Sequence, residues 1–244
     1  MIFERRVNIA DLPHDIFGNL RLSSILALAE SSASLHTDQM GITNELLLSL
    51  GVTFFIIKQK ITVNRYPKGK ENVTVTTQAY QPFGAQYSRT TKILDEAGNE
   101  LVVIDARWAL IDIESRKILR RPPENLIMNF DILDERPKQF KFALPEENLK
   151  GAESFTVTFT DLDRNGHVNN TVYADFICNI LGNEMYSGAA IKELTIFYSN
   201  EAKLGEKISP KKLIIGDKFW ITAENGDKCC FEADGSFFGK EEKI

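Results

Sequence analysis

The chain has 244 residues, of which 43% are hydrophobic and 26% charged, enough material for one large globular domain or two small fused ones. Its formal net charge of −5 at pH 7 argues against a general nucleic-acid binder, because no basic excess exists to neutralise phosphates. No apolar run approaches the ~20 residues of a membrane span, the charged N-terminus lacks a signal-peptide core, and the few cysteines and histidines form neither a disulfide framework nor a metal site. A cytoplasmic protein with no metal and no cofactor is expected.

The first half predicts a helix followed by strands. In the stretch DIFGNLRLSSILALAE, which begins at Asp15, apolar residues recur at spacings of three and four: Leu22, Ile25, Leu26, Ala29 and Ala33. Strand patterns follow over residues 54–69 and 92–103, and the second contains a Gly-bearing turn that is typical of a hairpin. The segment TDQMGITNELLLSL separates the helix from these strands.

A proline-rich, charged stretch without a sustained period, residues 119–151, is predicted to cross from one half to the other. This gives an N-terminal domain over residues 1–120, a linker over 121–151 and a C-terminal domain over 152–244.

The second half repeats the same order of elements. The alternating stretch SFTVTFT predicts a strand over 154–160. A helix follows, with apolar positions at Val168, Val172, Tyr173, Phe176, Ile177 and Ile180. Strand patterns then cover 194–205 and the hairpin 220–231. Three identities fall in the same order in both halves: Asn19 with Asn165, Gly69 with Gly205, and Gly98 with Gly226. The predicted class is α+β, with a long helix wrapped by an antiparallel sheet in each half.

The loop DLDRNGHVNNTV, residues 161–172, is dense in polar side chains. Its first half matches a calcium-binding loop, but the twelfth position is Val172, which offers no oxygen to a hard cation, and a strand rather than a helix precedes it. Calcium binding is therefore rejected. Taken alone, such a run is most often a turn that leads into a helix.

With the helix after it and the stretch ELTIFYSNEAKLGEKI, this loop resembles the fatty acyl–acyl carrier protein thioesterases of plant plastids and their bacterial relatives. The first half, through TTKILDEAGNELVVIDARWALIDIESRKILRRPP, resembles the same family. The resemblance implies two hotdog domains in tandem and hydrolysis of acyl carrier protein thioesters to free fatty acid and carrier protein. It also implies a catalytic set in loop and strand positions: Asp163, Asn165, His167 and Glu201. Where plant enzymes often have a cysteine after the glutamate, this chain has Ala202, so no cysteine nucleophile exists there.

The repeat predicts that only the second half carries chemistry. Aligned on Asn19 with Asn165, the first half has Phe17 and Arg21 at the positions of Asp163 and His167, and aligned on Gly69 with Gly205 it has Arg65 at the position of Glu201. In the second half, either Asp163 or Glu201 would activate a water, with Asn165 helping to fix it. The backbone N–H groups at the start of the helix after His167 would stabilise the oxyanion.

The first half is expected to hold the acyl chain, with these walls: Leu22, Ile25, Leu26, Ala29, Val52, Phe54 and Ile56. A basic segment is a candidate docking patch for the acidic carrier protein: Arg116, Lys117, Arg120 and Arg121. Three alternatives stay open, namely an acyl-CoA thioesterase, an enoyl-thioester hydratase of hotdog fold and a non-catalytic acyl-binding module. Chain-length preference and oligomeric state, including a homodimer, also stay open.

Overall fold

The computed structural model describes residues 1–132 and 139–239. Its N-terminal elements are β1 (Ile2–Asn8), α1 (Leu22–Gln39), α2 (Asn44–Ser49), β2 (Val52–Val63), β3 (Asn72–Ala79), β4 (Gln86–Leu94) and β5 (Glu100–Asp112). Its C-terminal elements are β6 (Lys150–Gly151), β7 (Phe155–Thr156), a 3₁₀ turn (Phe159–Asp161), α3 (Val172–Leu181), α4 (Asn183–Tyr186), β8 (Ile191–Tyr198), β9 (Lys207–Ile215), β10 (Lys218–Asn225) and β11 (Lys228–Phe237). Both predicted hairpins are present, as β4–β5 and β10–β11.

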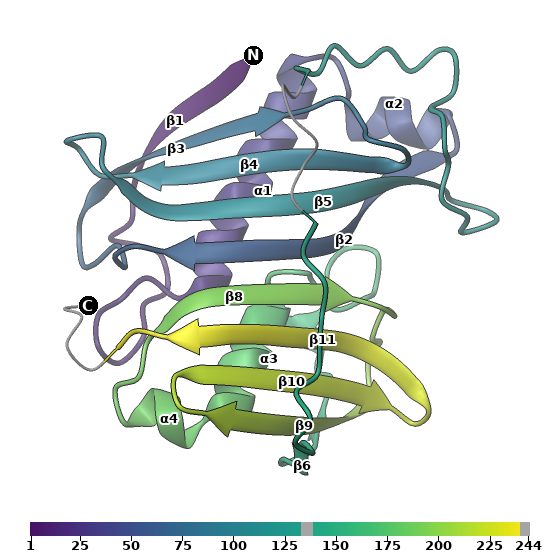
Figure 1. Ribbon diagram of the computed structural model, residues 1–244. Coiled ribbons are helices and arrows are strands. Elements are labelled where there is room, and N and C mark those ends of the chain that lie inside the picture. The colour runs from purple at the N-terminus through teal and green to yellow at the C-terminus, as the bar shows by residue number, and fades with distance from the viewer. Residues whose placement is uncertain (133–138, 240–244) are drawn as a thin grey trace.

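All strands join one antiparallel sheet, in the order β1-β3-β4-β5-β2-β8-β11-β10-β9-β6, with β7 beside β9 (Figure 1). The two halves meet where β2 pairs with β8, over Lys58–Thr62 and Glu193–Phe197. The strand predicted over 154–160 is much shorter, because β7 ends at Thr156 and the chain then turns.

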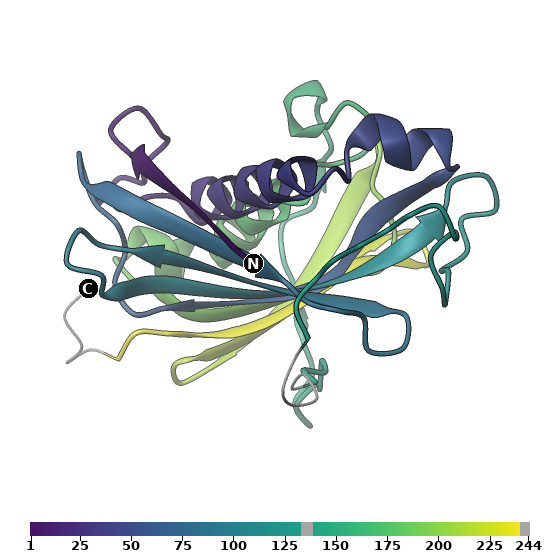
Figure 2. The ribbon, with the colours of Figure 1, turned by 90° about the horizontal axis from the view of Figure 1, so that it is seen from above.

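Helices α1 and α3 lie on the same face of the curved sheet (Figure 2). Ile25 of α1 and Ile177 of α3 are fully buried in one continuous core, and each stabilises the fold by roughly 1.5–3 kcal/mol. The helices are also tied directly, because Ser23 Oγ donates to Asp175 Oδ1 at 2.8 Å. No helix in the described ranges is long and apolar enough to cross a bilayer.

The segment that leaves β5 packs first beside α2, and from residue 139 on it runs along the opposite face of the sheet (Figure 1). Leu126 and Phe130 are buried in a second apolar cluster with Leu110. Farther along, Lys58 Nζ donates to the Phe140 carbonyl at 2.9 Å. This part of the predicted linker therefore packs against the sheet. Residues 133–138, also within that prediction, lie outside the described part of the chain.

The two halves repeat, but two residues away from the predicted register. Asp15 N donates to the Asn19 carbonyl at 2.8 Å, and Asp163 N donates to the His167 carbonyl at 2.8 Å. Between them Gly18 and Gly166 have φ of 77° and 79°, a left-handed turn that favours glycine. Asp15 is therefore the counterpart of Asp163, and Asn19 that of His167.

The strand side of the repeat is corrected in the same way. Leu20 N donates to the Pro67 carbonyl at 2.8 Å, as Val168 N donates to that of Ala202 at 2.9 Å. The residue before Ala202 is Glu201, so its counterpart is Tyr66. The predicted pairing with Phe17, Arg21 and Arg65 was wrong, because the shared asparagine set the loop two residues out of register and the shared glycine set the strand one residue out of register.

Candidate active site

A cleft of about 780 Å³ opens between the two halves. Its walls come from α1, β2, β4, β5 and the two loops at residues 163–170 and 200–201. The four predicted catalytic residues all line it: Asp163, Asn165, His167 and Glu201. Residues that lie up to 38 positions apart in the sequence therefore face one shared space.

His167 and Glu201 form the polar centre of the cleft. His167 Nε2 lies 3.1 Å from Glu201 Oε2, and both side chains are 21% exposed. Glu201 lies in the loop just after β8 rather than in a strand as expected. Because Nε2 faces a carboxylate, the proton belongs on Nε2, and Nδ1 becomes the acceptor nitrogen of the neutral ring.

Arg116 gives Glu201 a second partner. Its Nη2 forms an ion pair with Glu201 Oε2, across the boundary between the halves. The turn after β5 aims it there: Arg116 N donates to the Asp112 carbonyl at 2.9 Å, and φ of Arg116 is 59°. We expected Arg116 only in a surface docking patch, and its place in the site was missed. No local sequence signal marks it, because its partner is 85 residues away.

The Asp163 carboxylate is occupied by its own loop. Its Oδ1 accepts from the backbone N–H of Asn165 at 2.8 Å and of His167 at 3.3 Å, and its Oδ2 accepts from Asn165 Nδ2 at 3.1 Å. Asp15 does the same in the other half, where Phe17 N and Asn19 N donate to Oδ1 at 2.8 and 2.9 Å. The same contact therefore occurs in the first half, which has no counterpart of the His167 and Glu201 side chains. Its role is to shape the turn.

Asn170 supplies the free backbone donor nearest to His167. Helix α3 begins only at Val172, so the backbone N–H groups directly after His167 do not lie in its first turn as expected. Val168 N and Asn169 N already donate to carbonyls, whereas Asn170 N has no hydrogen-bond partner among the described residues. Asn170 lines the cleft, and its carbonyl accepts from Tyr198 Oη at 3.1 Å.

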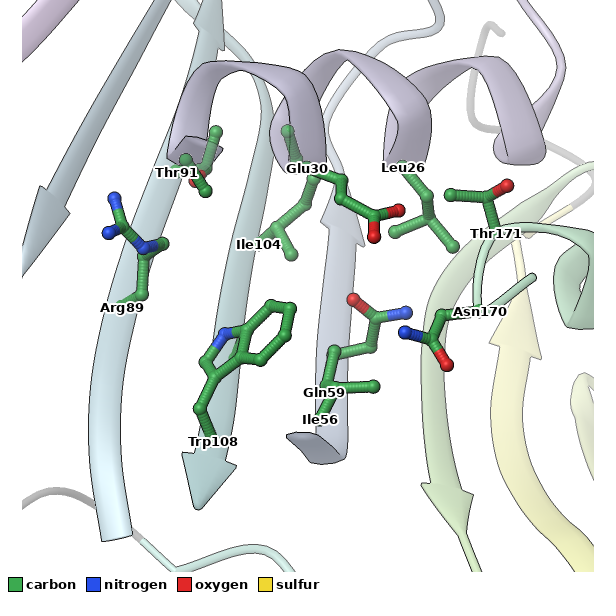
Figure 3. A pocket seen from close by; sticks show the side chains of 13 residues that line it. Leu26, Glu30, Ile56, Gln59, Arg89, Thr91, Ile104, Trp108, Asn170 and Thr171 are labelled. Carbon is green, nitrogen blue, oxygen red and sulfur yellow. The ribbon is translucent and has the colours of Figure 1, made fainter. Parts of the chain in front are cut away.

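The predicted acyl-pocket residues divide into three groups. Phe54 and Ile56 line the cleft. Leu26, Ala29 and Ile56 line a much smaller cavity of about 30 Å³ beside it, called the side pocket below (Figure 3). Leu22, Ile25 and Val52 line neither and are buried in the core, so their assignment to the pocket walls was wrong. A helix buried over much of its girth does not reveal by periodicity which face meets a cavity.

The cysteines carry no nucleophilic character. Burial raises the pKa of the Cys178 thiol to about 12 and that of Cys230 to about 11. Neither thiol ionises near neutral pH, and the thiolate is the reactive form.

Three more basic side chains follow Arg116 on the surface. Lys117, Arg120 and Arg121 are exposed, beyond the end of β5 and close in sequence to the cleft residue Arg116. They remain the predicted docking patch.

Known proteins resemble the chain along most of its length. A model of the acyl-ACP thioesterase N-terminal domain matches residues 1–128, and a model of the C-terminal domain matches residues 146–233. The acyl-[acyl-carrier-protein] hydrolase FATB2 of Cuphea viscosissima is 25% identical over 182 residues, covering 70% of this chain and 43% of that protein. A palmitoyl-acyl carrier protein thioesterase of Cuphea hookeriana is 25% identical over 181 residues, covering 69% and 42%. The chain thus spans less than half the length of these relatives.

Solved structures agree on the fold. An acyl-ACP thioesterase from Bacteroides thetaiotaomicron superposes with a TM-score of 0.86 at 19% identity, covering 97% of this chain and 98% of that one. A 12:0-ACP thioesterase from Umbellularia californica gives 0.83 at 17% identity, with 98% of each chain covered. Likeness at such identities shows the architecture, which is two hotdog units in tandem as predicted. With both domain models matched in order, the chain belongs to the acyl-ACP thioesterase family.

Proposed function

We propose that the protein hydrolyses fatty acyl–acyl carrier protein thioesters to free fatty acid and carrier protein. The observation that carries this is the contact of 3.1 Å between His167 and Glu201 in a cleft whose far wall is apolar. That wall includes Leu47, Phe54 and Phe130. An acyl tail placed there buries about 0.8 kcal/mol per methylene and leaves the thioester beside the polar pair.

The chemistry follows from which atoms are free. Glu201 Oε2 faces both His167 and Arg116, whereas His167 Nδ1 has no hydrogen-bond partner in the described part of the chain. Nδ1 takes a proton from water as the water oxygen attacks the thioester carbon. The resulting oxyanion accepts from the Asn170 backbone N–H. When the C–S bond breaks, the imidazolium returns its proton to the departing thiolate, and the acid and the carrier thiol leave.

In this scheme Asp163 and Asn165 hold the loop that presents His167. The first half, residues 1–120, supplies the acyl wall and Arg116. The second half, residues 152–244, supplies His167, Glu201 and Asn170. One active site per chain results, because Asn19 and Tyr66 stand where the first half would need a base and a carboxylate.

The test is release of free fatty acid from acyl carrier protein carrying chains of several lengths, with acyl-CoA of the same lengths in parallel. His167→Gln and Glu201→Gln should each lower kcat by ~10²-fold or more while the fold persists, because a positioned base contributes ~10²–10⁴ in rate. Release of no acid from any thioester would point to a binding module. Addition of water to an enoyl thioester would point to a hydratase.

Asp163 has a matched control within the chain. Asp163→Asn and Asp15→Asn alter equivalent turns, and an amide oxygen can still accept from the loop N–H groups. Both should cost similar stability, and Asp163→Asn should keep most of its turnover. A loss of ~10²-fold confined to Asp163→Asn would make Asp163 the base instead.

Docking is tested by charge reversal. Changing Lys117, Arg120 and Arg121 to Glu should weaken hydrolysis of the carrier-bound thioester and flatten its salt dependence, while small soluble thioesters react as before. Equal loss on both substrates would mean that the segment is structural.

A further inference from the structure

The side pocket has room for a small polar group. Its volume of about 30 Å³ is too small for an acyl tail, and it shares Glu30, Ile56 and Asn170 with the cleft that holds the catalytic pair. It therefore forms a branch off the cleft near the thioester. A plain alkyl chain has no group to place there.

Gln59 of β2 aims an unpaired oxygen into this pocket. The side chain is only 5% exposed, and its Nε2 donates to Tyr198 Oη. The direction of this hydrogen bond is fixed, because the Tyr198 hydroxyl donates to the Asn170 carbonyl at 3.1 Å and can therefore only accept from Gln59. Gln59 Oε1 is left on the side facing α1, without a hydrogen bond to any described residue (Figure 3).

Glu30 of α1 faces Gln59 from the opposite wall. Its carboxyl points into the pocket toward Gln59 and makes no hydrogen bond or ion pair with a described residue (Figure 3). Burial raises the pKa of this carboxyl above its usual value, and the nearby negative charge of Asp163 raises it further. Glu30 is therefore more readily protonated than an exposed glutamate, and its neutral form can both donate and accept.

Two oxygens that face each other across a gap of this size fit a group that accepts from one and donates to the other. A hydroxyl can do both: its hydrogen goes to Gln59 Oε1, and its oxygen accepts from the Glu30 carboxyl when that group is protonated. A keto oxygen can only accept and leaves Gln59 unpaired. A methylene satisfies neither, and unpaired buried polar groups are what lets a site reject an analogue that lacks a hydroxyl.

We propose that the side pocket binds a hydroxyl on the acyl chain close to the thioester, and that the preferred substrates are 3-hydroxyacyl thioesters. This specificity rests on the proposed thioesterase activity and names its substrate class. Glu30 and Gln59 are specificity-determining residues in this assignment and take no part in bond cleavage.

The test compares a 3-hydroxyacyl and a saturated acyl chain of equal length on the same carrier protein. The wild-type kcat/KM should favour the hydroxyacyl substrate by at least ~10-fold, because the site pairs the hydroxyl at both ends. Glu30→Leu, Gln59→Leu and Ala29→Leu, which fills the pocket, should each lower the hydroxyacyl kcat/KM and bring the ratio close to one. Glu30→Gln keeps a donor and an acceptor and should retain the preference. Gln39→Leu, at an exposed position of the same helix that lines neither the cleft nor the side pocket, is the matched control.

Three results would overturn the inference: a ratio near one in the wild type, a ratio unchanged by Glu30→Leu, or the same shift in Gln39→Leu. Each of these results leaves hydrolysis of saturated acyl chains intact, so it would refute the hydroxyl site without refuting the proposed thioesterase function. If no thioester is hydrolysed, calorimetry with free 3-hydroxy and saturated fatty acids decides the matter. Tighter binding of the hydroxy acid that Glu30→Leu abolishes supports the pocket, and equal binding refutes it. Thermal melts of every variant separate unfolding from lost recognition.

Discussion

Acid should destabilise this protein through His36. The ring is 1% exposed near the end of α1, and its Nδ1 accepts from the buried guanidinium of Arg89 at 3.1 Å. Burial, together with the smaller effect of the Arg89 charge, lowers the pKa of His36 to about 4. Protonation would put a second cation against Arg89, so the folded protein keeps the ring neutral.

The direction and size of this destabilisation follow from the difference between the pKa of His36 in the folded and in the unfolded chain. An unfolded histidine takes up its proton near its ordinary pKa of about 6.5, whereas the folded one takes it up only near 4, so the unfolded chain binds more protons in between. The contribution of His36 to the free energy of unfolding is fully present above the unfolded pKa of about 6.5, and it is lost as the pH falls toward the folded pKa of about 4. Between about pH 7 and pH 5 the loss amounts to ~2 kcal/mol of the free energy of unfolding.

Urea denaturation at these two pH values measures this loss, and His36→Gln isolates it. Glutamine keeps an acceptor for Arg89 but does not titrate, while every other ionisable group is common to both proteins. The wild type should lose about 2 kcal/mol more than the variant on acidification. An equal loss in both proteins would refute the reasoning.

Three further outcomes are expected. Phe54→Ala removes part of the apolar wall and so enlarges the cleft. In fatty-acid release assays it should shift the preferred acyl chain to longer lengths, since each added buried methylene raises kcat/KM about fourfold. An unchanged length profile would place the tail elsewhere. Gly235→Ala should lower the free energy of unfolding by about 3 kcal/mol in urea titrations, because the new Cβ would lie 2.2 Å from the Glu193 carbonyl, whereas Gly151→Ala meets open space and should be nearly neutral. Cys178→Ala should retain turnover in the same release assay, and its inactivation would contradict the hydrolysis by water proposed above.

The sequence predicted the architecture because each half carries its own periodicity. Hairpins are local, so Gly98 and Gly226 marked both of them correctly. The repeat was also detectable, but its register was not. Asn19 and Asn165 are chemically identical, while the true equivalents Asn19 and His167 share only a backbone position, which hydrogen bonds reveal and residue identity does not.

The site was predictable only where motif and family pattern coincide. His167 and Glu201 belong to that pattern, and the structure brings them together. The contact of Arg116 with Glu201 and the proposed roles of Glu30 and Gln59 were missed, because each depends on what lies opposite across the cleft. A signal existed for Glu30, which interrupts an otherwise apolar helix face four residues after Leu26. The pairing of β2 with β8, which brings Gln59 next to Tyr198, leaves no recognisable pattern in the sequence of either strand.

That pairing of β2 with β8 also limits how substrate can enter. Many enzymes with a site between two lobes open and close about a flexible joint. Here the lobes share backbone hydrogen bonds across one sheet, and rotation of one against the other would break them. Under the proposed function, a long acyl chain would therefore enter a cleft whose two halves do not rotate apart. Entry and exit rates should then depend on the length of the chain being threaded, even when the chemical step does not.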